Sequence, residues 1–105
     1  MTGFCQVITT WPDQESADAM AARAVRERLA ACAQVSGPLA STYRWDDKIE
    51  QAKEWYCYLK TTLDRLPTLE ARIRQVHPYD TPEIIAVPIM QGNPAYLDWI
   101  RDSVA

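Results

Sequence analysis

The sequence of 105 residues contains only three glycines and one histidine, and this scarcity excludes several kinds of site. Motifs that cradle phosphate groups on backbone amides need clustered glycines, and neither a P-loop nor a G-x-G-x-x-G motif occurs. The nucleophile motif G-x-S-x-G is also missing. Because no catalytic constellation is left, the sequence predicts a protein that is not an enzyme.

Cysteine is equally sparse, with Cys5, Cys32 and Cys57 at wide spacings and no C-x-x-C pair. An odd number of separated cysteines favours reduced, buried thiols in a cytoplasmic protein over a disulfide framework. The N-terminus has no basic region followed by an apolar core, so no signal peptide is expected.

Long apolar runs and basic blocks are missing as well. The longest uncharged run, residues 29–43, is too short to span a bilayer and is broken by Gly37 and Pro38, so no membrane partner is expected. With 11 basic and 14 acidic side chains mixed along the chain, the net charge is -3. This acidic balance gives no electrostatic support to a nucleic-acid partner.

What the chain does contain is regular periodicity, which indicates one domain over residues 1–105. Apolar alternation and helical spacing predict strands over 4–11, 32–45, 49–62 and 84–90, and helices over 14–31, about 67–77 and after 94. Asp13 is the expected N-cap of the first helix, and Ser36-Gly37-Pro38 is expected to form a bulge or a bend in the second strand. Because Pro88 cannot donate to a ladder, the last strand should lie at a sheet edge or carry a bulge.

This order predicts an α+β fold, the ferredoxin-like β-α-β-β-α-β sandwich with an extra C-terminal helix. Two main helices cover only one face of a four-stranded sheet. The second half of the third strand, residues 55–59, and the strand at 84–90 are nevertheless apolar on both faces. We therefore expect an oligomer whose sheets meet, with the aromatics of residues 43–58 in core and interface packing.

The segment from His77 to Ile89 joins a helix end to a strand through a link held rigid by Pro78 and Pro82. We expect this link to border any site. His77 is a candidate metal ligand, with Cys32, Cys57, Asp80 and Glu83 as possible partners. The alternative is a histidine that interacts with the last carbonyls of its helix.

Cys32 is a candidate soft ligand for Cu(I), against the alternative of a small buried hydrophobe. Asp80 and Glu83 are candidate acid–base groups or hard-metal ligands, against the alternatives of turn support and strand initiation. No spacing in the sequence matches a dedicated zinc or iron–sulfur site.

Several segments, in order and over nearly the whole chain, resemble the CutA divalent-cation tolerance proteins. These are TTWPD at 9–13, ERLAAC at 27–32, YRW at 43–45 followed by IE at 49–50, LKT at 59–61, HPYDTPEI at 77–84 and GNPAYLDWI at 92–100. Two features depart from the family pattern. Asp47 stands where a turn glycine is common, and Val76 stands where some members carry a second histidine.

The resemblance implies a ferredoxin-like subunit, a homotrimer built through sheet-to-sheet contacts, similarity to the trimeric PII signalling proteins, and a role in tolerance of copper and other divalent metals. It places His77 and Cys32 at positions proposed for metal binding. It also matches five residues to an intersubunit cleft, namely Tyr43, Trp45, Lys60, Tyr79 and Glu83.

Three functions follow as hypotheses. The first is a cytoplasmic homotrimer that binds copper or another divalent metal ion without catalysis. The second is a PII-like signalling trimer that binds a small anionic metabolite in the cleft lined by Lys60. The third is a trimeric scaffold for a protein partner.

Overall fold

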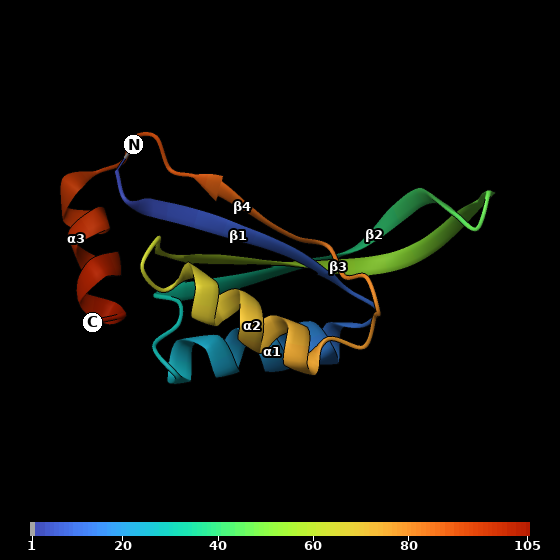
Figure 1. The fold of residues 1–105 in the computed structure, drawn as a ribbon, viewed down its shortest axis with the longest axis horizontal. Coiled ribbons are helices and arrows are strands. Elements are labelled where there is room, and N and C mark those ends of the chain that lie inside the picture. The colour runs from blue at the N-terminus through green and yellow to red at the C-terminus, as the bar shows by residue number, and fades with distance from the viewer. Residues whose placement is uncertain (1) are drawn as a thin grey trace.

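The computed structural model describes residues 2–105, in which four strands and three helices follow one another in the predicted order (Figure 1). The elements are β1 (Phe4–Trp11), α1 (Gln14–Arg26), β2 (Cys32–Trp45), β3 (Lys48–Thr62), α2 (Leu66–Val76), β4 (Ile84–Pro88) and α3 (Pro94–Ser103). The predicted α+β class and β-α-β-β-α-β order are confirmed. None of the helices in this part of the chain is long and apolar enough to cross a membrane.

The strands form one antiparallel sheet in the order β2-β3-β1-β4. β4 is therefore an edge strand, as the proline at its end predicted, and Pro88 lies opposite Cys5. β4 ends at Pro88, two residues before the predicted end at Met90. The predicted bulge in β2 is confirmed by a shift of register between Ser36 and Leu39.

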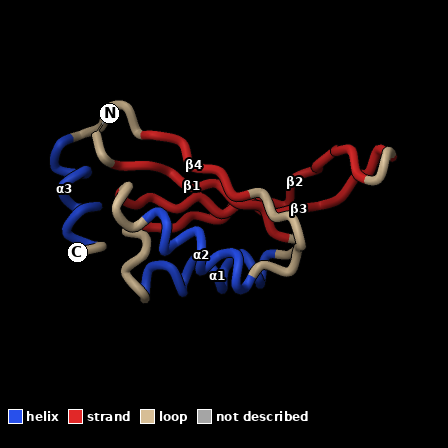
Figure 2. The backbone as a smooth tube through the Cα atoms, viewed as in Figure 1, coloured by secondary structure: helices blue, strands red, loops and turns tan. Residues whose placement is uncertain are grey.

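The main core lies between the sheet and the two helices α1 and α2, which cover the same face of the sheet (Figure 2). Every second residue of the central strands points into it, including Val7, Trp11, Cys57 and Leu59. These side chains meet buried residues of the helices, namely Ala17, Met20, Ala24, Leu69 and Ile73. A second, smaller cluster joins α3 to the start of β1, where Ile100 and Val104 pack with Phe4.

The opposite face of the sheet has no second layer over it among residues 2–105 (Figure 1). Ile85 is 48% exposed and Val87 45% exposed on β4. We call this surface the open face; it carries Gln6, Ile8, Tyr56, Tyr58, Lys60, Ile85 and Val87. The apolar character that the sequence predicted for both sides of the sheet is thus present, and one side is left uncovered in the single subunit.

Beyond Trp55, the last residue of β3 that pairs with β1, β2 and β3 continue as a long two-stranded arm that extends away from the rest of the subunit (Figure 1). This arm comprises residues 39–54. At its tip, Asp46 and Asp47 both have positive φ, at 50° and 60°, as a two-residue type I′ turn requires. Trp45 still pairs with Lys48 across this turn, so the missing turn glycine has not disrupted the hairpin register.

α1 begins at its predicted cap, where the carboxylate of Asp13 accepts a hydrogen bond from the backbone N–H of Ser16 at 2.7 Å. The predicted end at Ala31 is wrong, because the helix stops at Arg26. Arg28 has a φ of 59°, its N–H bonds the carbonyl of Val25, and the N–H of Leu29 bonds that of Ala24. This is a Schellman termination, which is hard to recognise from sequence when the left-handed residue is not glycine.

We predict that Arg28→Gly stabilises the protein by about 1 kcal/mol, because glycine adopts positive φ without the clash of a Cβ atom. Arg26→Gly is the matched control at the last residue of α1 and should destabilise by about 1 kcal/mol. Urea denaturation of both variants, at one subunit concentration, checks the signs. Equal losses of stability in the two variants would contradict the strained conformation at Arg28.

Candidate functional site

His77 ends α2 and holds the following link against β1 through both of its ring nitrogens. Nδ1 accepts a hydrogen bond from the backbone N–H of Tyr79 at 3.1 Å. Nε2 therefore carries the proton and donates it to the carbonyl of Thr10 at 2.7 Å. The imidazole also stacks on the indole of Trp11, with ring centroids 4.1 Å apart. The side-chain partner is thus a carbonyl of β1 and not the last carbonyls of the helix.

These contacts keep the imidazole of His77 neutral and engage both of its ring nitrogens in hydrogen bonds. The residue is 9% exposed, and burial lowers the pKa of its imidazole below the ordinary value of 6.5, against the opposing effects of the Thr10 carbonyl and Glu54. With one nitrogen donating and the other accepting, no lone pair of the ring is free in the single subunit. To bind a metal ion, His77 has to give up one of these two hydrogen bonds.

Tyr79 and Glu54 form the second contact of this region. The hydroxyl of Tyr79 donates to a carboxylate oxygen of Glu54 at 3.1 Å. Burial, followed by the Glu54 carboxylate, raises the pKa of Tyr79 to about 12. The charged sequence of residues 50–54 predicts that this half of β3 projects into solvent, and this prediction is wrong for Glu54, which is only 8% exposed. The link after α2 passes over it, a contact that the strand pattern alone does not reveal.

Glu83, just before β4, adds a second carboxyl group to this region. Burial raises the pKa of Glu83, and the nearby charge of Glu54 raises it further. Asp80, the other acidic candidate of the link, is exposed. We call His77, Tyr79, Glu54 and Glu83 the histidine group.

Cys32 lies elsewhere, at the start of β2. Its sulfur is 3.6 Å from the hydroxyl of Tyr96 on α3, a residue of the family-like segment 92–100 that was not predicted to belong to a site. Across the sheet it pairs with Lys60, whose ammonium donates to the side-chain oxygen of Gln34 at 2.8 Å. We call Cys32, Lys60, Gln34 and Tyr96 the cysteine group. By contrast, Cys57 is fully buried, and burial raises the pKa of its thiol to about 12, so it is a core residue.

The two groups lie at opposite ends of the sheet. Lys60 is opposite Gln6 on β1, whereas His77 contacts Thr10, four residues further along that strand. Four residues of a strand span about 13 Å. Cys32 and His77 therefore cannot contact one metal ion within a single subunit. Tyr43 and Trp45 lie on the arm, 43% and 53% exposed. Tyr43 is near enough to the histidine group to contribute to the raised pKa of Tyr79.

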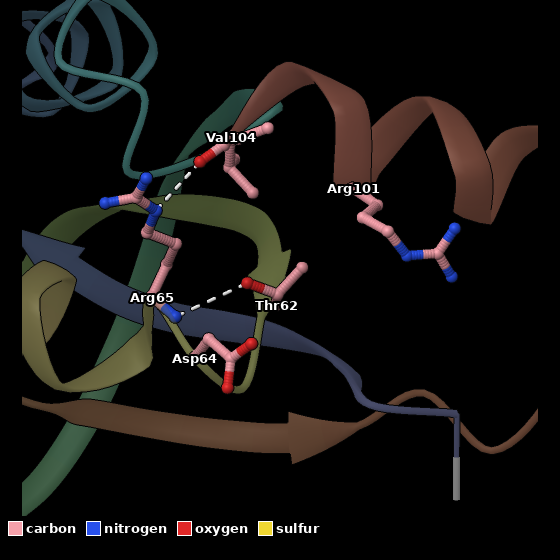
Figure 3. Close-up of a pocket in the computed structure, with 6 residues that line it drawn as sticks. Thr62, Asp64, Arg65, Arg101 and Val104 are labelled. Atoms are coloured by element: carbon pink, nitrogen blue, oxygen red, sulfur yellow. Dashed lines mark hydrogen bonds between the residues drawn. The ribbon is translucent and has the colours of Figure 1, made fainter.

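Within residues 2–105, no three His, Cys, Asp or Glu side chains lie close enough together to hold a metal ion. One open cavity of about 370 Å³ lies between the turn after β3 and the end of α3 (Figure 3). Its two arginines already have partners, because Arg65 donates to the Val104 carbonyl at 2.8 Å and Arg101 to Asp98 at 2.8 Å. None of the predicted metal ligands or cleft residues lines this cavity.

We predict that His77→Gln lowers the free energy of unfolding by about 1–3 kcal/mol at pH 8, because two buried hydrogen bonds are disturbed. The folded-state pKa of His77 lies below 6.5. The stability contributed by the neutral ring is therefore complete above pH 6.5 and is lost as the pH falls toward the folded-state value. Denaturation at pH 8 and pH 5 should show a smaller difference between wild type and variant at pH 5. A difference independent of pH would rule out this linkage.

Comparison with known proteins places the whole fold in one family. The family model described as "CutA1 divalent ion tolerance protein" matches residues 5–103. The divalent-cation tolerance protein CutA of Thermus thermophilus is 42% identical over 97 residues, which cover 92% of this chain and 94% of the relative. The crystal structure of CutA from Xylella fastidiosa, at 37% identity, superposes with a TM-score of 0.95 and covers 98% of this chain and 99% of its own.

A second solved structure, the periplasmic divalent cation tolerance protein CutA from Archaeoglobus fulgidus, has a TM-score of 0.94 at 33% identity. It covers 97% of this chain and 99% of its own. Both the sequence relationship and the fold relationship extend from β1 to α3. The chain therefore belongs to the CutA divalent ion tolerance family.

Proposed function

We propose that this chain is the subunit of a PII-like homotrimer that serves in divalent-cation tolerance by binding a metal ion without catalysis. The observation that carries the proposal is the uncovered open face of the sheet together with the projecting arm. Ile85 and Val87 on the face, and Trp45 and Ile49 at the arm tip, are all more than 40% exposed. Apolar surface of this extent is typical of a protein–protein interface.

The arm gives a reason for a closed ring. The arm extends past the end of β1. Its two strands, β2 and β3, pair there only with each other and with no third strand of the same subunit. An arm of this kind is stabilised when it lies on a neighbouring copy. Head-to-tail contacts of identical subunits close into a ring when the rotation allows it, and the family resemblance supports three subunits.

Copper or another divalent metal ion is the proposed ligand, held by Cys32 of one subunit and His77 of its neighbour. Thiolate and imidazole together suit copper and zinc. The two residues lie at opposite ends of the sheet, so a head-to-tail arrangement is the one that brings them together. The partly exposed thiol of Cys32 supports this role, whereas His77 has to release the N–H of Tyr79 or the carbonyl of Thr10.

A second candidate is a small anionic metabolite at Lys60, as in a PII-like signalling trimer. It is supported by the ammonium of Lys60, whose hydrogen-bond partner is the neutral side chain of Gln34. A thermal-shift screen of small anions separates this candidate from the metal, since only a ligand of the folded state raises the melting temperature. We place the protein in the cytoplasm because all three cysteines are free thiols.

We predict that sedimentation gives one species with three times the mass of the 12.0 kDa chain at micromolar concentration. Ile85→Asp with Val87→Asp should convert it to smaller species, because two buried carboxylates in an apolar interface are costly. Asp substitutions of exposed residues on the helix layer, such as Ala22→Asp, are the control. A wild type that sediments as a monomer would refute the trimer.

We predict that calorimetric titration of the reduced trimer with copper gives one saturable site per subunit or per trimer. Cys32→Ala and His77→Ala should each lose it, since each removes one of two donors. Met90→Leu, which removes a thioether that is 81% exposed, is a matched control for nonspecific binding by soft sulfur. Binding that is indifferent to both Cys32→Ala and His77→Ala would reject these residues as ligands.

A further inference from the structure

Arginines are concentrated on the helix layer, at the C-terminal end of α1 and beside it on α2. Four of the 11 basic side chains are found here, and within residues 19–29 the one carboxylate is Glu27. We call Arg23, Arg26, Glu27, Arg28 and Arg72 the arginine patch. The net charge of the chain is -3, so the patch is a positive region on an otherwise acidic molecule.

Glu27 is shared by two arginines that come from different helices. The Nε of Arg23 lies 2.8 Å from one of its carboxylate oxygens, and the Nε of Arg72 lies 2.9 Å from the other. The hydrogen bond from Arg23 lowers the pKa of the Glu27 carboxyl below its ordinary value, so this group is ionised at neutral pH. One negative charge therefore faces two positive charges, and Arg26 and Arg28 add two more.

This shared carboxylate fixes the two guanidinium groups without satisfying them. Both ion pairs use Nε, and the Nη1 of Arg72 donates to Gln75 at 3.0 Å. The buried Nε of Arg72 makes no well-aligned hydrogen bond within residues 2–105, although it lies close to Glu27. The side chains of Arg23 and Arg72 are 36% and 32% exposed, so both can reach a further acceptor. The terminal nitrogens of a guanidinium group bind a carboxylate as a two-pronged fork.

The patch is accessible and complete within one subunit. α1 and α2 lie on one side of the sheet, and the open face is on the other side (Figure 1). Arg26 and Arg28 are exposed. An interaction at the patch therefore depends neither on the proposed trimer nor on the proposed metal ion.

We propose that the arginine patch binds a short acidic segment of a partner protein, whose carboxylates contact Arg23, Arg26 and Arg72. Arg23 and Arg26 are about 5 Å apart along the axis of α1. The two packed helices are about 10 Å apart, which places Arg72 on the far side of the groove between them. Cations spaced in this way match several carboxylates along one peptide better than they match a single small anion.

The choice of arginine also favours a protein partner. All of the basic side chains of α1 and α2 are arginines, whereas the three lysines of the chain, Lys48, Lys53 and Lys60, all lie on β3. Arginine is enriched at protein–protein interfaces and lysine is depleted there, because the planar fork pairs with carboxylates at a lower cost of desolvation.

A short acidic peptide fits this surface better than a nucleic acid does. About six extended residues, roughly 20 Å, are enough to cover the patch. Asp13, Glu15 and Asp18 lie at the N-terminal end of the same helix, α1. A long polyanion that continued along α1 would meet these carboxylates and be repelled by them.

Fluorescence anisotropy with fluorescein-labelled hexaglutamate as the probe tests the proposal at low ionic strength. Arg23→Gln and Arg72→Gln should each raise the dissociation constant about 3-fold, and the triple variant Arg23→Gln/Arg26→Gln/Arg72→Gln at least ~10-fold. Binding by the wild type should weaken as salt is added. A wild type that does not bind the probe, or a triple variant that binds like the wild type, overturns the proposal.

Arg74→Gln is the matched control for a general effect of charge. Arg74 also pairs with a glutamate, Glu70, at 3.0 Å, but it lies about 200° around α2 from Arg72 and so faces away from α1. This variant should bind the probe like the wild type. Equal losses in Arg74→Gln and Arg72→Gln would overturn the patch as the binding site. An oligonucleotide of equal charge that binds more tightly than hexaglutamate would overturn the acidic peptide as its ligand.

Arg28→Gly separates binding from folding. The positive φ of Arg28 predicts that this variant is more stable than the wild type, yet it removes one charge of the patch. Weaker binding of hexaglutamate by a more stable protein is the expected result, and a loss of structure cannot produce it. Unchanged binding in both Arg28→Gly and Arg72→Gln would overturn the proposal.

Discussion

The structure depends on a sheet that has two apolar faces and only one layer of helices. α1 and α2 bury one face completely, with Val7, Leu59 and Ile73 at 0% exposure. The described residues 2–105 supply no second layer, and their remaining helix, α3, covers only the end of the sheet at Phe4. Burial of apolar surface is the main favourable term in folding and in association, so the uncovered face is the strongest constraint on the proposed assembly.

The candidate site follows from the same constraint. The link after α2 has to pass the end of β1 to reach the edge position of β4, and His77 fixes that passage by binding Thr10 and Tyr79. Cys32 and Lys60 are carried by β2 and β3 at the other end of the sheet. A site that uses both groups therefore belongs to an assembly and not to one chain, which is why the oligomer is central to each proposed function.

The fold was largely predictable because strong local signals agreed with one another. The cap at Asp13, the bulge after Ser36 and the edge position of Pro88 all follow from local backbone chemistry, and each is found. The termination of α1 at Arg26 was missed because a left-handed arginine gives no sequence signal. The burial of Glu54 and the contact between Cys32 and Tyr96 were missed for another reason. Both join residues far apart in the chain, 25 and 64 positions respectively, and no periodicity records such distances.

The central position of β1 sets the order in which this chain can complete its fold. β1 pairs with β3 on one side and with β4 on the other, so its second edge stays open until Ile84–Pro88 has left the ribosome. During synthesis, the strand edge of a nearly complete sheet is exposed to other nascent chains, which is a hazard for aggregation. Pairings over such long sequence separations also slow folding. A short edge strand ending in proline limits how long a foreign strand can pair there once the sheet has closed.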